Sequence, residues 1–310
     1  MPLDPTTEAV LAQLAEADAP PMSQLPPAAA REMYAQMQPP APELEVGAVE
    51  DRKIPGPDGE IPVRIYRPAG DGPFPVHVFF HGGGWVIGDL DTHDADCREL
   101  CRGAGCIVVA VHYRLAPEHP FPAAPEDCYA ATAWAAAHAE EIGGRTGPVT
   151  VGGDSAGGNL AAVVALLARD RGGPEIALQL LVYPVTDGAM DSPSYEENGE
   201  GYLLTTDSMR WFWDHYCPPA QREDPRASPL RATELSGLPP AVVLTAEYDP
   251  LRDEGLAYAE RLRAAGVPVE YRCFEGLIHG FFSQARMIPA GRAGIDFAVD
   301  ALRRVQGRGA

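Results

Sequence analysis

The stretch Val151-Gly-Gly-Asp-Ser-Ala-Gly-Gly158 decides the fold, because it places a serine in a Gly-rich turn between an apolar run and an Ala-rich segment. Its G-x-S-x-G pattern, from Gly153 to Gly157, is typical of a nucleophile elbow, a sharp strand-to-helix turn that exposes one serine hydroxyl. Only small residues fit beside the serine in so tight a turn. The helix start behind it favours negative charge that develops nearby. We therefore predict that Ser155 is a catalytic nucleophile.

A second Gly-rich stretch lies upstream, where the apolar residues 76–80 lead into His81-Gly-Gly-Gly-Trp85. Successive glycines expose backbone N–H groups and let the chain approach a ligand closely. Acyl-transfer enzymes need such donors for the oxyanion of the tetrahedral intermediate, and losing one typically costs about 100- to 1,000-fold in rate. We predict an oxyanion hole formed by the amides of Gly83, Gly84 and Ala156.

Three neighbouring residues are expected to support this site rather than to react. His81 starts the glycine loop, and we expect it to organise that loop by hydrogen bonding rather than act as a base. Gly82 is expected to serve the loop's conformation. Asp154, beside the predicted nucleophile, is expected to brace the turn with its side chain.

Two apolar runs downstream each lead into a polar residue. Residues 241–245 precede Asp249, and residues 269–274 precede His279. The order serine, aspartate, histidine along the chain is that of the α/β-hydrolase triad. In that chemistry His279 takes the proton of Ser155 and returns it to the leaving group, while Asp249 orients the imidazole and stabilises its charged form. The rival carboxylate Asp253 is expected to start the next helix, stabilised by unpaired N–H groups.

These motifs resemble those of bacterial carboxylesterases of the hormone-sensitive-lipase-like family, often called family IV. The matching stretches are His81-Gly-Gly-Gly-Trp85, Tyr113-Arg-Leu-Ala-Pro-Glu118, Gly153-Asp-Ser-Ala-Gly-Gly158, Asp249-Pro-Leu-Arg-Asp-Glu-Gly255 and His279-Gly-Phe281. The resemblance runs from about residue 40 onward, with no departure at a catalytic position. It implies hydrolysis of short- to medium-chain esters without a cofactor.

The pattern of the chain predicts an α/β fold: a mostly parallel sheet with helices on both faces and a small helical cap. Strands are expected at residues 43–49, 61–67, 76–80, 106–112, 148–152, 177–183, 241–245 and 269–274, with a turn at 55–59. Helices are expected near residues 6–17, 28–38, 93–104, 124–140, 156–170, 253–265 and 293–305, with Thr6 or Thr7 capping the first. The predicted catalytic α/β-hydrolase domain comprises residues 43–184 and 236–310, and the cap comprises residues 1–42 and 185–235. The aromatic stretch at 209–216 is expected mainly to pack the cap, with one or two rings lining a substrate pocket.

The composition of the chain argues against several classes of binding partner. The net charge of −20 argues against binding nucleic acid or an anionic membrane. No apolar stretch reaches the roughly 18 residues of a membrane helix, and the N-terminus lacks signal-peptide features, so a cytoplasmic protein is expected. Cys97 and Cys101 have a C-x₃-C spacing, but no second Cys/His pair completes a zinc pattern, so we predict buried thiols and no metal.

Three functions are compatible with these residues. The first is a serine carboxylesterase acting on a small-molecule ester through an acyl-enzyme. The second is an amidase or deacetylase with the same triad, because the choice of leaving group depends on the shape of the pocket. The third, disfavoured by the complete triad, is a relative that binds a small ligand without catalysis. A homodimer is possible, and the sequence does not decide it.

Overall fold

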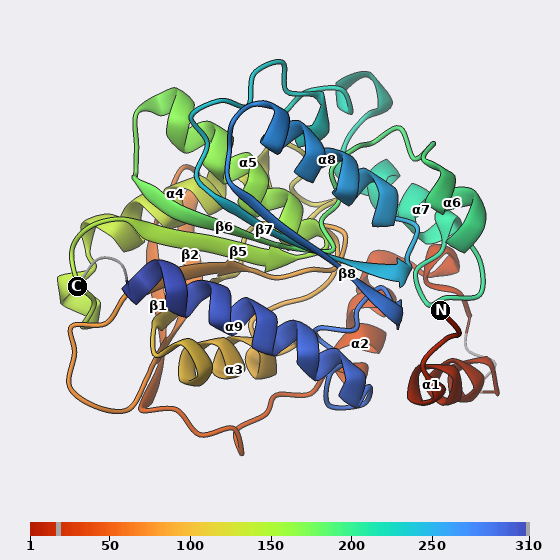
Figure 1. The fold of residues 1–310 in the computed structure, drawn as a ribbon, viewed down its shortest axis with the longest axis horizontal. Helices are drawn as coiled ribbons and strands as arrows, with labels where there is room; N and C mark the ends of the chain where they lie inside the picture. Colours follow the sequence, from red (N-terminus) through yellow and green to blue (C-terminus); the bar gives the residue numbers. More distant parts are fainter. Residues whose placement is uncertain (17–19, 308–310) are drawn as a thin grey trace.

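The computed structural model describes residues 1–16 and 20–307 and is built on one eight-stranded sheet (Figure 1). The strands are β1 (Ala48–Gly56), β2 (Gly59–Arg67), β3 (Val76–Phe80), β4 (Ile107–Val111), β5 (Val149–Asp154), β6 (Ile176–Val182), β7 (Ala241–Tyr248) and β8 (Val269–Ile278). Their order is β1-β2-β4-β3-β5-β6-β7-β8. β2 pairs antiparallel with both β1 and β4, and the remaining pairs are parallel.

Helices cover both faces of this sheet, as the sequence predicts. The longer ones are α3 (Asp94–Ala104), α4 (Ala123–Ala137), α5 (Ala156–Arg171), α8 (Arg252–Ala264) and α9 (Arg292–Gly307). α3 and α9 pack together on one face, and α4, α5 and α8 cover the other (Figure 1). Each face therefore has its own apolar core. None of the described helices is both long and apolar enough to cross a membrane.

The central elements are found where the sequence predicts them because they are buried all round. Every residue of β3, β4 and β5 is buried, so these strands read as continuous apolar runs. Helix α5 is buried throughout residues 156–168, since its small and aliphatic side chains face β-strands on one side and helices on the other. The predicted strand at residues 76–80 coincides with β3, and that at 106–112 is one residue longer than β4 at each end.

The first strand is the main error of the prediction, which placed it at residues 43–49. In the structure β1 spans Ala48–Gly56 and pairs with β2 across a turn of two residues, 57 and 58. β1 is an edge strand in which only Ile54 is buried, so its charged side chains obscure the strand pattern. Pro55, expected in the turn, belongs to this strand, which is possible because an edge strand does not need every N–H group.

The cap of the first helix was also assigned to the wrong residue. Helix α1 spans Pro5–Glu16, and its first amides bind the side chain of Asp4 rather than Thr6 or Thr7. The Asp4 carboxylate accepts hydrogen bonds from the backbone N of Thr6 and of Thr7, both at 3.0 Å. The predicted end of this helix, at residue 17, lies outside the described residues.

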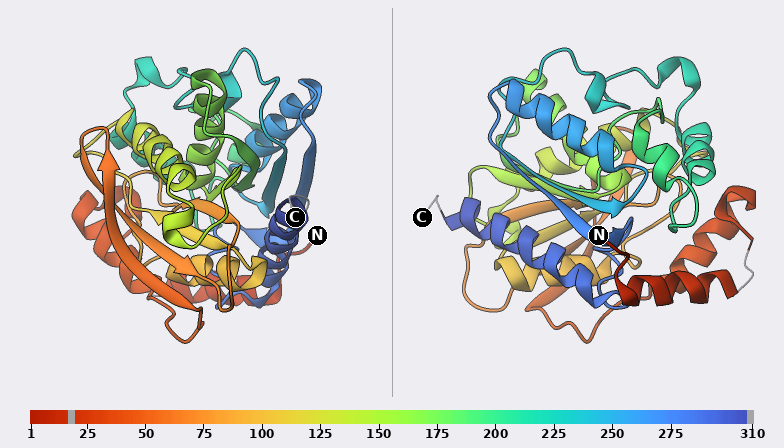
Figure 2. Two further views of the ribbon diagram at one scale, coloured as in Figure 1. Left: turned by 90° about the vertical axis from the view of Figure 1, so that its left-hand side faces the viewer. Right: turned by 45° about the vertical axis from the view of Figure 1, so that its right-hand side comes forward.

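Two segments far apart in sequence lie at the same end of the sheet. One contains α1, the 3₁₀ turn η1 (Met22–Gln24) and α2 (Pro27–Met37), and the other contains α6 (Pro193–Asn198) and α7 (Thr206–Tyr216). The ribbon views place both beside the carboxyl ends of the parallel strands (Figures 1 and 2). η1 and α7 are in direct contact.

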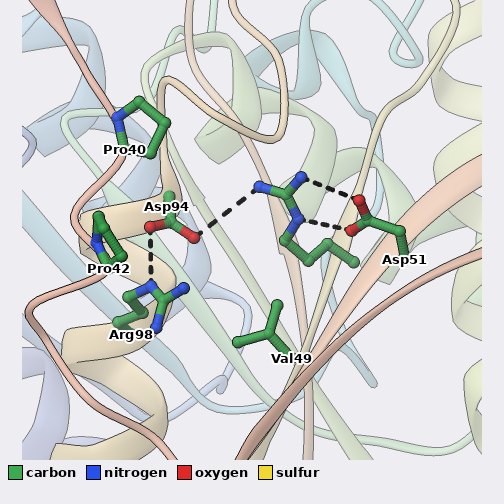
Figure 3. A pocket seen from close by; sticks show the side chains of 7 residues that line it. Pro40, Pro42, Val49, Asp51, Asp94 and Arg98 are labelled. Atoms are coloured by element: carbon green, nitrogen blue, oxygen red, sulfur yellow. Dashed lines mark hydrogen bonds and ion pairs between the residues drawn. The ribbon is translucent and has the colours of Figure 1, made fainter.

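A buried carboxylate attaches the segment after α2 to the sheet. Asp94, at the start of α3, is 2% exposed and lies beside a surface pocket that Pro40 and Pro42 help to line (Figure 3). Its carboxylate accepts hydrogen bonds from Ala41 N at 2.9 Å, from the Tyr66 hydroxyl at 2.9 Å and from Arg98 Nε at 2.7 Å. One side chain thus connects the N-terminal segment, β2 and α3.

Replacing Asp94 by alanine is expected to lower the free energy of unfolding by about 3 kcal/mol, because three donors lose a buried charged acceptor. The matched control is Asp91→Ala, which removes an exposed carboxylate paired with Arg64 and is expected to cost at most about 1 kcal/mol. Urea unfolding of both variants measures the difference. Equal losses would contradict the structural role of Asp94.

Candidate active site

The three residues predicted as a triad follow three strand ends and meet. Ser155 follows β5, Asp249 follows β7 and His279 follows β8, and parallel strands bring their carboxyl ends to one edge of the sheet. His279 Nε2 lies 3.0 Å from Ser155 Oγ. Its Nδ1–H donates to Asp249 Oδ2 over 2.7 Å. The side chains form a continuous hydrogen-bonded chain from hydroxyl to carboxylate.

Ser155 occupies a strained backbone conformation. Its φ of 56° and ψ of −118° are rare for a residue with a side chain, and such strain is concentrated at functional sites. The turn is held by Ser155 N donating to Val182 O at 2.9 Å, and by Gly157 lying directly against Phe80 O. This is the geometry of the elbow that the G-x-S-x-G pattern predicts.

The two rival carboxylates have different surroundings. Asp249 is fully buried, and besides His279 it accepts a hydrogen bond from Leu251 N at 2.8 Å. Asp253 lies in the first turn of α8, as predicted, but it does not bind the amides of its own helix. Its carboxylate instead accepts from Ser194 N at 2.9 Å and pairs with Arg252 Nε at 2.7 Å. The expectation that the first amides of the helix stabilise Asp253 was wrong, because Ser194 N and the Arg252 guanidinium bind its carboxylate instead.

The glycine loop presents backbone donors. Gly83 and Gly84 have φ values of 106° and 56°, which residues with a side chain rarely adopt. Among residues 1–16 and 20–307, no protein acceptor binds the amide of either glycine. Ala156 is the first residue of α5, so its amide is one of the N–H groups that a helix start leaves unpaired. The ring of Phe212, from α7, packs directly on Gly84.

His81 is buried and holds the start of this loop. Its Nδ1–H donates to Gly82 O at 2.8 Å, and its ring stacks on Tyr113 with centroids 4.3 Å apart. The Tyr113 hydroxyl donates to His81 O at 2.8 Å. Burial lowers the pKa of His81 to about 3, so this imidazole is neutral.

Asp154 connects the elbow to the glycine loop. Its buried carboxylate accepts a hydrogen bond from Gly82 N at 2.8 Å and lies 3.3 Å from His93 Nε2. A side chain on Gly82 would collide with this carboxylate. Gly82 is therefore required by the close approach of Asp154 as well as by the loop.

Sequence reasoning missed His93 and Tyr183 near the site and did not single out Phe212 within the aromatic stretch at 209–216. His93 contacts Asp154, the ring of Tyr183 lies 4.5 Å from that of His279, and Phe212 covers Gly84. The pattern of the sequence holds no signal for His93 or Tyr183, because each reaches the site through packing between distant segments. The aromatic stretch containing Phe212 was expected mainly to pack, and Trp213 and Tyr216 do so, since both are fully buried against Trp85.

Metal-binding groups are not found in the described part of the chain. It contains no group of three or more His, Cys, Asp or Glu side chains placed to hold an ion. Cys97, Cys101 and Cys106 are buried, as the sequence predicts, and form no disulfide.

The sequence is similar to those of known ester hydrolases. A family model described as alpha/beta hydrolase fold matches residues 77–283. The chain is 52% identical over 271 residues to the carboxylic ester hydrolase LipN of Mycobacterium tuberculosis, covering 85% of this chain and 72% of the relative. It is 41% identical over 266 residues to the ethyl acetate hydrolase of Pseudomonas putida, covering 84% of each.

Solved structures agree over nearly the whole chain. A thermostable esterase from Pseudomonas putida superimposes with a TM-score of 0.95 at 42% identity, covering 98% of both chains. A hyperthermophilic esterase from the archaeon Pyrobaculum calidifontis gives a TM-score of 0.93 at 41% identity, covering 98% of this chain and 99% of the other. The chain therefore belongs to the α/β-hydrolase family, among the carboxylesterases related to hormone-sensitive lipase.

Proposed function

We propose that this carboxylic ester hydrolase uses Ser155 as its nucleophile, His279 as its general acid and base, and Asp249 as the residue that orients the histidine. The observation that carries the proposal is the hydrogen-bonded chain from Ser155 Oγ through His279 to Asp249. The proposed substrates are short- to medium-chain acyl esters.

The reaction proceeds in two halves. Ser155 Oγ attacks the ester carbonyl carbon, and its proton passes to His279 Nε2. The bond to the leaving alkoxide then breaks, and His279 returns the proton to it, which leaves an acyl-enzyme and a free alcohol. Water attacks the acyl-enzyme while His279 takes a proton from it, the acyl–Oγ bond breaks to release the carboxylic acid, and His279 returns its proton to Ser155 Oγ.

The amides of Gly83, Gly84 and Ala156 are proposed to bind the oxyanion. Their availability in the described structure supports this role, because a buried donor without a partner is costly unless a ligand satisfies it. His81, Gly82 and Asp154 are proposed to hold these amides in place through the contacts described above.

Residues 1–42 and 185–235 are proposed to form a cap over Ser155 that limits the acyl chain. Two contacts support it: Phe212 packs on Gly84, and Leu203 lies against Gly280, beside His279. Bulky side chains from the second segment thus border both the oxyanion loop and the proposed base. The proposed enzyme needs no cofactor, and the homodimer and the cytoplasmic location expected from the sequence remain predictions.

Initial hydrolysis rates on p-nitrophenyl esters from acetyl to palmitoyl test the substrate class. We expect a maximum at short or medium chains, because Phe212 and Leu203 restrict the space beside the site. Ser155→Ala, measured in parallel, should abolish the activity. A maximum at palmitoyl would contradict the proposed cap, and activity that persists without Ser155 would contradict the mechanism.

Matched ester and amide substrates with the same acyl group separate the esterase from an amidase or deacetylase. We expect the ester to be cleaved with the higher kcat/KM. Faster cleavage of the amide would reassign the leaving group while leaving the triad in place. Ligand binding without turnover of either substrate would instead favour a non-catalytic role.

The assignment of Asp249 over Asp253 is tested by two substitutions. Asp249→Asn is expected to lower kcat by about 10⁴-fold, because the amide stabilises the wrong tautomer of His279. Asp253→Asn serves as the matched control four residues away and is expected to change kcat less than about tenfold. The reverse order of effects would overturn the assignment.

A further inference from the structure

A buried histidine lies on the carboxylate that joins the elbow to the glycine loop. His93, directly before α3, is 1% exposed, and its Nε2 lies 3.3 Å from Asp154 Oδ1. The same oxygen accepts the amide of Gly82 at 2.8 Å. Asp154 directly precedes Ser155, and Gly82 directly precedes Gly83, so this pair touches the backbone of both halves of the proposed site.

One ring nitrogen of His93 is hydrogen-bonded to Thr92. Thr92 Oγ1 lies 3.0 Å from His93 Nδ1, donates its own proton to Asp89 O at 3.0 Å, and accepts the Asp89 amide at 2.9 Å. A threonine hydroxyl has only one proton to give. When that proton goes to Asp89 O, the hydroxyl accepts from His93, and Nδ1 carries a proton in this arrangement.

The other nitrogen faces an acceptor. If Nε2 were unprotonated, its lone pair would face the Asp154 carboxylate and compete with it for the Gly82 amide, which lies 3.2 Å from Nε2. If Nε2 carries a proton, it donates to Asp154, and the Gly82 amide also donates to Asp154 at the shorter distance of 2.8 Å. With both ring nitrogens protonated, Nδ1 donates to Thr92 Oγ1, Nε2 donates to Asp154, and the bond from Thr92 to Asp89 O is kept.

We propose that His93 is held as an imidazolium and acts as a positioning residue: its charge fixes the Asp154 carboxylate, which in turn fixes Gly82 and the oxyanion amides that follow it. This inference rests on the proposed esterase mechanism, and it adds a pH-dependent element to the same site. His93 itself touches no reacting atom in this account.

The surroundings of His93 are predominantly acidic. The titratable groups that face it come from α2, the glycine loop, the loop before α3, α3 itself and the elbow: Tyr34, His81, Asp89, Asp96 and Asp154. Burial alone would lower the pKa of His93, but the carboxylates of Asp154, Asp96 and Asp89 raise it above its ordinary value. Burial would raise the pKa of Asp154, but the charge of His93 and the bond from Gly82 lower it. Burial raises the pKa of Asp96 to about 7, so the charge on that carboxylate varies near neutral pH.

The direction of these pKa shifts predicts how kcat changes with pH. A histidine whose pKa is raised in the folded protein is charged below that pKa and loses its contribution as the pH rises through it. We therefore expect the kcat of the wild type to fall on the alkaline side as His93 loses its proton.

Two substitutions of His93 distinguish the effect of its titrating N–H group from the effect of the volume of its ring. His93→Gln retains an N–H donor that does not titrate, so we expect kcat within about tenfold of the wild type and an alkaline limb that is shifted or absent. His93→Phe retains a ring without donors, and we expect kcat to fall about 10- to 100-fold with a smaller change in KM. His77→Gln is the control for loss of a buried histidine, because burial lowers the pKa of His77 to about 3 and it does not titrate on the alkaline side.

The state of the ring is measured directly by long-range ¹H–¹⁵N spectra of the full chain labelled with ¹⁵N-histidine. We expect an imidazolium signal at pH 7 that disappears in His93→Gln and whose titration matches the alkaline limb of kcat. Asp154→Asn provides a second assignment should His93→Gln fail to fold: the neutral amide still accepts from Gly82, and His93 should become neutral at pH 7.

A neutral His93 at pH 7, or the same alkaline limb in wild type and His93→Gln, would overturn the proposal. Loss of the proposed esterase function is distinguishable from this. In that case the wild type would show no hydrolysis that depends on Ser155, while the spectra would still report whether His93 is charged.

Discussion

The close approach of two glycines to one carbonyl group determines the position of the proposed active site. Gly153 and Gly157 both lie directly against Phe80 O, where any side chain would collide with the backbone. This contact lets β5 end and α5 begin beside the end of β3, from which the glycine loop continues at His81. The strained backbone of Ser155 and the free amides of the loop are neighbours because of it. The proposed triad, the proposed oxyanion hole and the proposed cap all depend on that arrangement.

Buried carboxylates extend this constraint to the surrounding loops. Asp154 binds the Gly82 amide, and Asp249 binds the Leu251 amide while it orients His279. Glu254 accepts hydrogen bonds from Thr186 N at 2.6 Å and from Asp187 N at 3.3 Å, at the start of the second proposed cap segment. In each of these contacts the donor is a backbone amide, which does not titrate. His93 differs because its partner contact depends on its own proton.

The sequence was most informative where burial is complete and least where an element is exposed or a contact is long-range. β3 and α5 were predicted almost to the residue because they are buried and consist mainly of apolar and small residues. β1 was misplaced because an exposed edge strand carries charged side chains that resemble a loop. The meeting of Ser155, Asp249 and His279 was predicted from the G-x-S-x-G pattern, from the order of the three residues along the chain and from their positions after predicted strands. The contact of His93 with Asp154 was not predicted, because it joins the loop before α3 to the elbow, two segments far apart in sequence, and leaves no local pattern.

Identification of the residue that becomes covalently modified tests the central claim most directly. The enzyme would be treated with a fluorophosphonate, digested and analysed by peptide mass spectrometry, with the hydrolytic activity followed in the same sample. The account predicts one adduct, on Ser155, in proportion to the activity lost, and none in Ser155→Ala. Loss of activity with the adduct on another residue, or full labelling of Ser155 with hydrolysis unchanged, would contradict it.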